Sequence, residues 1–191
     1  MLSNDQLLFL DSKDYFILKN EVDQELNKLL YSAQQKLVDY WTETKNLLIP
    51  EGVSKIPGKI SKGYNYKGYP YQVFDFPSAF DERGIFSFRL VVWYGHFFSL
   101  NLLITNHFKD FYQDHLLELN SAETYLLLSD KIWETDTSVF KSVLLTKERH
   151  NEIRTYFEKN KSIRLFRLFN MNQINDLNRL TIECFKDWFA K

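Results

Sequence analysis

The sequence predicts an α+β fold: an antiparallel β-meander packed by helices, with a long N-terminal amphipathic helix and a C-terminal helix. Apolar residues recur every three to four positions near both ends of the chain, which is the period of an amphipathic helix. The middle of the chain instead holds long β-branched and aromatic runs, which are typical of strands. Because 191 residues suit one domain, we expect a single α+β domain over residues 1–191.

Two helices are expected before the first loop. Ser3 is followed three residues later by Gln6, which is the spacing of a capping box and indicates a short helix over the next apolar run. From Asn20 onward the apolar side chains return at helical steps, and this predicts a long amphipathic helix that ends before Pro50. The composition then shifts to Gly, Pro, Lys and Ser up to residue 68, which predicts a loop.

The meander is expected to start with a hairpin of residues 64–66 and 69–76 across Lys67-Gly68. Residues 77–84 contain turn formers and are expected to connect this hairpin to the next strand. After the meander the pattern predicts a helix capped by Asn106. The remaining predicted elements are strands at 124–128 and 140–145, a helix at 147–160, a strand at 163–169 and a helix at 173–189.

Residues 85–105 hold two strong strand patterns separated by Gly95-His96. If these two residues form a type II′ loop, Trp93 lies opposite Phe98 and Arg89 lies opposite Leu102. In that register neither face of the hairpin is polar, so both faces need a cover. Helices are expected to cover one face, and helices, a second sheet layer, a ligand or a partner subunit the other.

Composition and charge narrow the class of protein. Aromatic residues make up 17% of the chain, and side chains of this size fill a core or line an apolar cavity. The net charge of −1 gives no overall reason to expect nucleic acid as a partner. The first residues lack the pattern of a signal peptide and no apolar run is long enough to span a bilayer, so we expect a cytoplasmic protein without a membrane partner. Cys184 is the single cysteine, which excludes an internal disulfide, and no cofactor is expected.

The stretch from Gly68 to Phe98 carries YPYQVFDFPSAFD, then FSFR, then WYGHFFS. In these motifs the chain resembles an uncharacterised bacterial protein family of about the same length. The resemblance implies no activity and no catalytic or binding residue. It implies only that the aromatic meander is the signature region of such a family.

Arg89 is the first candidate site residue, because strand alternation places its cation on a face with Val91, Trp93 and Phe98. A buried guanidinium needs partners. One interpretation is a structural ion pair with Asp75 of the neighbouring strand, which we favour. The other is bidentate binding of a ligand carboxylate or phosphate.

His96 lies at the bend of the central hairpin between Tyr94 and Phe97, where an imidazole can act as acid or base in an aromatic pocket. A turn residue is nevertheless expected to meet solvent. An enzyme of unassigned reaction would use Arg89 to hold an anionic substrate and His96 or Asp75 for proton transfer.

Two further patterns have simpler structural explanations. His107, Asp110 and Asp114 share one helical face at metal-ligand spacing, but a solvated face explains them and we expect no metal. Lysines and tyrosines interleave from Lys55 to Tyr71, as on single-strand nucleic-acid surfaces. A hairpin arm whose lysines protect an exposed edge explains this second pattern, so nucleic acid is not the favoured partner.

These observations favour a non-enzymatic binding or interaction protein with an aromatic pocket or a subunit interface. Its occupant would be an apolar or anionic small molecule, or a second copy of the chain. The residues expected to line that site are Arg89, Trp93, Tyr94, Phe98 and Tyr71. The enzyme and the weak nucleic-acid binder remain the alternatives.

Overall fold

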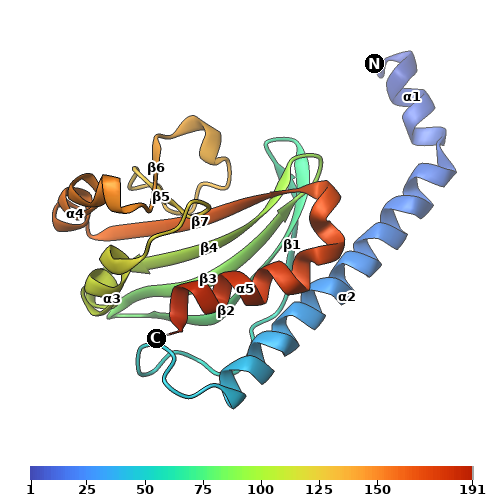
Figure 1. The fold of residues 1–191 in the computed structure, drawn as a ribbon. Coiled ribbons are helices and arrows are strands. Elements are labelled where there is room, and N and C mark those ends of the chain that lie inside the picture. The colour runs from blue at the N-terminus through green and yellow to red at the C-terminus, as the bar shows by residue number, and fades with distance from the viewer. Residues whose placement is uncertain (191) are drawn as a thin grey trace.

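The computed structural model describes residues 1–190 and has an antiparallel sheet with helices across it (Figure 1). Its strands follow the order β1-β2-β3-β4-β7-β5-β6. Four consecutive strands therefore lie side by side, which confirms the predicted meander and the α+β class. The strand bounds are β1 (Ser61–Tyr66), β2 (Tyr69–Asp81), β3 (Gly84–Trp93), β4 (Phe97–Thr105), β5 (Tyr125–Leu127), β6 (Ser142–Leu144) and β7 (Ser162–Asn170).

The α-helices are α1 (Asn4–Asp11), α2 (Lys13–Glu43), α3 (Asn106–Glu118), α4 (His150–Lys159) and α5 (Leu177–Phe189). Short 3₁₀ turns η1 (Thr137–Val139), η2 (Lys147–Arg149) and η3 (Met171–Asp176) connect several elements. The capping box of Ser3 and Gln6 is present as predicted. Helix α2 starts before Asn20 because no helix breaker separates residues 13–19 from the predicted stretch, and it ends at Glu43, before Pro50 as predicted.

One face of the sheet forms the core beneath α2, α3 and α5. Alternate residues of β3 and β4 point into it: Phe86, Phe88, Leu90, Val92, Phe98, Leu100, Leu102 and Ile104. Helix α5 meets these side chains with Phe185, Trp188 and Phe189, all buried. Figure 1 shows α5 and the second half of α2 lying across this face, whereas α1 and the beginning of α2 project beyond the body.

The predicted register of the central hairpin was wrong by one residue. Trp93 pairs with Phe97, and Arg89 pairs with Asn101. Three residues, 94–96, form the loop in place of two, and Gly95 supplies the left-handed backbone with φ of 74°. A slip of one residue exchanges the faces of a strand, so Phe98, Leu100 and Leu102 lie on the side opposite Arg89. The Arg89 face instead carries Ser87, Ser99 and Asn101, so the expectation of two apolar faces was also wrong.

Two boundaries also differ from the predictions. Strand β2 continues to Asp81 through the stretch predicted as a connection, because a register shift between Asp75 and Ser78 accommodates Pro77 within the ladder. Thr105, at the end of β4, is the N-cap of α3, and Asn106 is the first residue of that helix. The hairpin across Lys67-Gly68 is confirmed.

Tyr112 is buried against Phe86, and within residues 1–190 its hydroxyl has no hydrogen-bond partner. Burial raises the pKa of this phenol. Tyr112→Phe keeps the stacked ring and removes an unpaired polar group, so we expect an unchanged free energy of unfolding or a gain of up to about 1 kcal/mol. Urea denaturation measures the change.

Tyr156→Phe is the matched control, because the Tyr156 hydroxyl donates to the Ser129 carbonyl at 3.0 Å. This variant should lose about 1 kcal/mol. A loss from Tyr112→Phe as large as that from the control would show that the Tyr112 hydroxyl is bonded in solution.

Candidate functional site

The Arg89 face of the sheet is covered by the chain itself. The β5–β6 connection, residues 128–141, crosses this face and places Trp133 over the Arg89 guanidinium, 4.4 Å from the ring centre. The β1–β2 turn holds the connection from its other side, since Lys67 Nζ lies 2.9 Å from an Asp136 carboxylate oxygen. The β5–β6 connection of the same molecule therefore covers part of the Arg89 face.

Arg89 and Asp75 form a bidentate ion pair on adjacent strands. Arg89 Nε donates to Asp75 Oδ1 at 2.7 Å and Nη2 donates to Oδ2 at 2.9 Å. Ser87 also donates its hydroxyl to Asp75. About a fifth of each charged side chain is exposed, 21% for Arg89 and 22% for Asp75. This geometry agrees with the structural interpretation, and a ligand carboxylate would have to displace Asp75. Binding of a ligand by Arg89 stays a prediction.

A second buried arginine, Arg164 of β7, lies beside this pair and was not singled out in the sequence. Its Nε and Nη2 donate to Asn101 Oδ1 at 3.0 and 2.7 Å, and its Nη1 donates to the carbonyls of Ile132 and Glu134. Burial, together with the positive charge of Arg89, lowers the pKa of Arg164 to about 10. Arg164 thus fastens the covering connection to the sheet. The sequence feature that could have indicated this role is the position of Arg164 between Ile163 and Leu165 in a predicted strand.

His96 is exposed at the end of the hairpin. Its ring stacks on Trp93 at 3.6 Å between centroids, and within residues 1–190 its imidazole makes no hydrogen bond. Arg89 lies four residues before Trp93 along β3, roughly 13 Å away at the rise of a strand. The fold therefore brings Arg89 and Asp75 together but leaves His96 apart, so Asp75 is the one of the two predicted proton-transfer groups that lies at Arg89.

Tyr94 faces α2 rather than the Arg89 side. Its hydroxyl donates to Asp23 at 2.6 Å and accepts from the Gln72 amide at 2.7 Å. Burial and the neighbouring Asp23 raise the pKa of Tyr94. Burial opposes ionisation of Asp23, but hydrogen bonds from Lys19 and Tyr94 outweigh it and lower the pKa of Asp23. This cluster ties α2 to the end of the sheet.

The five residues expected to line one ligand site do not share a face. Phe98 packs in the core against Phe169, on the side opposite Trp93 and Arg89. Trp93 is buried, and Tyr71 lies opposite it on β2. The one-residue register difference accounts for Phe98, because it moved this residue to the other side of the sheet.

The other two sequence patterns lie on the surface. His107, Asp110 and Asp114 are exposed on α3, and no group of three or more His, Cys, Asp or Glu side chains in residues 1–190 could hold a metal ion. Of the lysines between Lys55 and Tyr71, Lys67 is paired with Asp136. Nucleic-acid binding by this segment stays a prediction.

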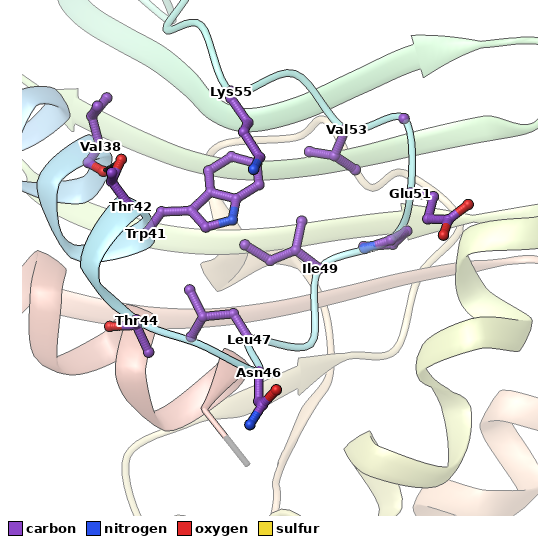
Figure 2. A pocket seen from close by; sticks show the side chains of 12 residues that line it. Val38, Trp41, Thr42, Thr44, Asn46, Leu47, Ile49, Glu51, Val53 and Lys55 are labelled. Carbon is purple, nitrogen blue, oxygen red and sulfur yellow. Dashed lines mark hydrogen bonds between the residues drawn. The ribbon is translucent and has the colours of Figure 1, made fainter.

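Figure 2 shows a pocket of about 570 Å³ at the C-terminal end of α2. Val38 and Trp41 point into it from α2, and Ile49 and Val53 from the following loop. Lys55 Nζ lies 5.6 Å from the centre of the Trp41 ring and forms no ion pair with any carboxylate in the described part of the chain. An aromatic surface beside an unpaired cation can accept a small molecule that carries an apolar ring and an anionic group.

A groove of about 550 Å³ runs between the first half of α2 and η3. It is mainly apolar, with Val92 and Tyr94 at its base and Glu21 and Glu25 on α2 also lining it. The apolar side chains along its walls are Leu18, Val22, Leu26, Leu29, Met171 and Ile174. This α2–η3 groove has a more apolar lining than the Trp41 pocket.

Residues 1–22, the N-terminal arm, expose a long series of large apolar side chains. Helix α1 has no buried residue. The exposed fraction lies between 37% and 71% for Leu2, Leu7, Leu8, Phe9, Leu10, Tyr15, Phe16, Ile17, Leu18 and Val22. Phe9, Tyr15 and Phe16 contact one another where α1 meets α2, with ring centroids 4.7 to 5.4 Å apart. Capping and periodicity predicted helices in this part of the chain. They did not predict that the sheet ends before it reaches these helices and leaves their apolar side chains exposed.

Comparisons with family models, with curated proteins and with solved structures found no match to this chain. The resemblance of residues 68–98 to a bacterial family therefore stays a prediction. No helix within residues 1–190 is long and apolar enough to cross a membrane.

Proposed function

We propose that this chain is a non-enzymatic interaction protein that docks onto another polypeptide through its N-terminal arm. The observation that carries the proposal is the series of ten large apolar side chains exposed over residues 2–22. A soluble monomer seldom exposes contiguous apolar surface of this extent, and such surface marks an interaction site. The rest of the molecule acts as a scaffold for the arm. Its partly buried Arg89 is paired with Asp75, and its buried Arg164 is bonded to the β5–β6 connection.

The charge of the arm and the start of α2 favours a polypeptide over an anionic lipid surface. Residues 1–31 contain six acidic and three basic side chains. Helices that lie on anionic membranes have lysine and arginine on their polar face instead. The apolar series of an amphipathic helix is also the usual docking element of helix-in-groove recognition between proteins.

A photo-crosslinking amino acid at Phe9 tests the proposal in the cells that produce the full chain. We expect one reproducible polypeptide adduct, identified by mass spectrometry, that disappears when Ile17→Glu is added. The matched control carries the crosslinker at Val139, which is 59% exposed on the body. Adducts at Phe9 no more frequent than at Val139 would refute docking through the arm.

Small-ligand binding in the Trp41 pocket is a second candidate function, supported by the unpaired cation of Lys55 beside the Trp41 ring. Titration with 1-naphthoate, followed by NMR of the Trp41 indole N–H, is expected to show saturable binding. Lys55→Met should weaken it about tenfold, the effect of losing one charge-assisted hydrogen bond of about 1.4 kcal/mol.

Lys59→Met is the control, because Lys59 is exposed on the same loop but does not line this pocket. Equal weakening in the Lys55 and Lys59 variants would indicate a general charge effect and contradict the pocket assignment.

A further inference from the structure

We infer that the occupant of the arm is a second copy of this chain, and that each copy places the start of its α2 in the α2–η3 groove of the other. This inference rests on the proposed function and adds the identity of the partner. It follows from the position of the groove, from the charges along α2, from the area available and from the length of α1.

Arm and groove form one continuous surface. Leu18 and Val22 belong to the arm and also line the groove, where Leu26 and Leu29 continue the same apolar stripe of α2. A twofold axis requires a single patch that is complementary to itself, with donor and acceptor parts on the same molecule. An apolar helix face that runs directly into an apolar groove fulfils this requirement.

The sequence of α2 is complementary to itself in an antiparallel pairing centred near Val22. In that pairing, Leu18 lies opposite Leu26 of the second copy, and Tyr15 lies opposite Leu29 of the second copy. Lys19, which already pairs with Asp23 of its own chain at 2.8 Å, then also lies opposite Glu25 of the second copy, and the twofold axis repeats this contact. Among the described residues of its own chain, Glu25 pairs with Lys28 alone, and both side chains are more than two-thirds exposed. An exposed pair of this kind is weak and is readily exchanged for another.

The exposed area of the arm matches what a stable dimer needs. Ten leucine-sized to tyrosine-sized side chains, each about half exposed, offer on the order of 1,000 Å² of apolar surface. Standard protein interfaces bury about 800 Å² on each partner. Five of these side chains precede α2 and five belong to it, so an interface of standard size covers α1 together with the start of α2.

The arm of the same molecule is too short to fill the groove. Helix α1 has eight residues and is about 12 Å long at the rise of an α-helix. If α1 folded back about Ser12, it would end beside Asn20. Leu26 lies fourteen residues beyond Ser12, which is about 21 Å along α2. The part of the groove near Leu26 can thus be filled only by another chain.

Crosslinking through a new cysteine tests the arrangement in the full chain. The native Cys184 is buried, and burial raises the pKa of its thiol, so it should not react with a maleimide. Val22→Cys lies near the proposed twofold axis, and a short bis-maleimide should join two copies into a covalent dimer. Val139→Cys, on the body, should give no such dimer above background.

Light scattering after size exclusion supplies the second measurement. Wild-type protein is expected as a dimer at micromolar concentration, and Leu18→Glu should weaken the dimer at least tenfold, because it places a charge in the apolar groove. The circular dichroism of Leu18→Glu should match that of the wild type, since Leu18 is 59% exposed and supports no core contact.

The outcomes separate this inference from the proposed function. A wild-type protein that stays monomeric at 100 µM and gives no Val22 crosslink, while Phe9 still captures a different chain, overturns the second copy but leaves docking through the arm. A dimer that crosslinks through Val139 and not through Val22 overturns the arrangement. A monomer whose Phe9 position captures no more polypeptide than Val139 overturns both proposals.

Discussion

Replacing Phe88 with alanine is expected to lower the free energy of unfolding by about 4 kcal/mol, the range measured for buried aromatic residues. Phe88 is fully buried in the middle of β3. Its ring meets Phe185, Trp188 and Phe189 of α5 at centroid distances of 5.3 to 5.8 Å. Removal leaves a cavity between sheet and helix that close-packed neighbours can fill only in part.

Urea denaturation of Phe88→Ala and of a surface variant, Val139→Ala, measures the effect. Val139 is 59% exposed on η1, so its replacement should change the free energy by no more than about 0.5 kcal/mol. A loss below about 1.5 kcal/mol for Phe88→Ala would show that α5 does not depend on this contact with the sheet.

Replacing Asp75 with alanine is expected to cost about 3 kcal/mol, although the residue is polar and lies on a strand. The Asp75 carboxylate accepts hydrogen bonds from Nε and Nη2 of Arg89, and Arg164 adds a second positive charge nearby. Without Asp75 the Arg89 guanidinium remains under Trp133 and close to the positive charge of Arg164, with its own counter-charge removed. Breaking a buried pair by removing one partner costs more than the pair contributes, and about one-fifth exposure moderates that cost.

The double variant Asp75→Leu with Arg89→Met should lie within about 1 kcal/mol of the wild type, because it removes both charges together. A double-mutant cycle with Asp75→Leu, Arg89→Met and this double variant therefore decides between the two roles of Arg89. A loss for the double variant that equals the sum of the two single losses would mean that Arg89 does not depend on Asp75. The arginine would then be available to an anionic ligand.

Local patterns were sufficient for most of the elements. The capping box at Ser3, the hairpin at Lys67-Gly68 and the final helix depend on residues close in sequence, and each was confirmed. The ion pair of Arg89 with Asp75 was also accessible, because strand alternation places both on one face of adjacent strands. Periodicity and turn chemistry depend on residues that are close in sequence, so these elements can be predicted without knowing the tertiary structure.

The register of the central hairpin required the structure. Gly95-His96 allowed a two-residue loop, but Tyr94 leaves the ladder to bond Asp23 of α2, seventy-one residues away in sequence. The three-residue loop occurs together with this distant contact. The resulting one-residue shift in the β3–β4 register decides which side chains lie on the same face as Arg89. Arg164 joined the same face through pairing of β4 with β7, which is equally remote in sequence.

The sequence by itself determined an aromatic α+β domain with an antiparallel meander, a long amphipathic helix and one cation on a strand face, since these follow from periods of two and 3.6 residues. Only the tertiary structure decided what covers that face and where apolar surface stays uncovered. The β5–β6 connection has no periodic pattern, and the arm has apolar runs, residues 7–10 and 15–18, of the kind that buried helices also contain. Whether such a helix is buried depends on where the sheet ends beneath it, and that edge is set by long-range strand pairing.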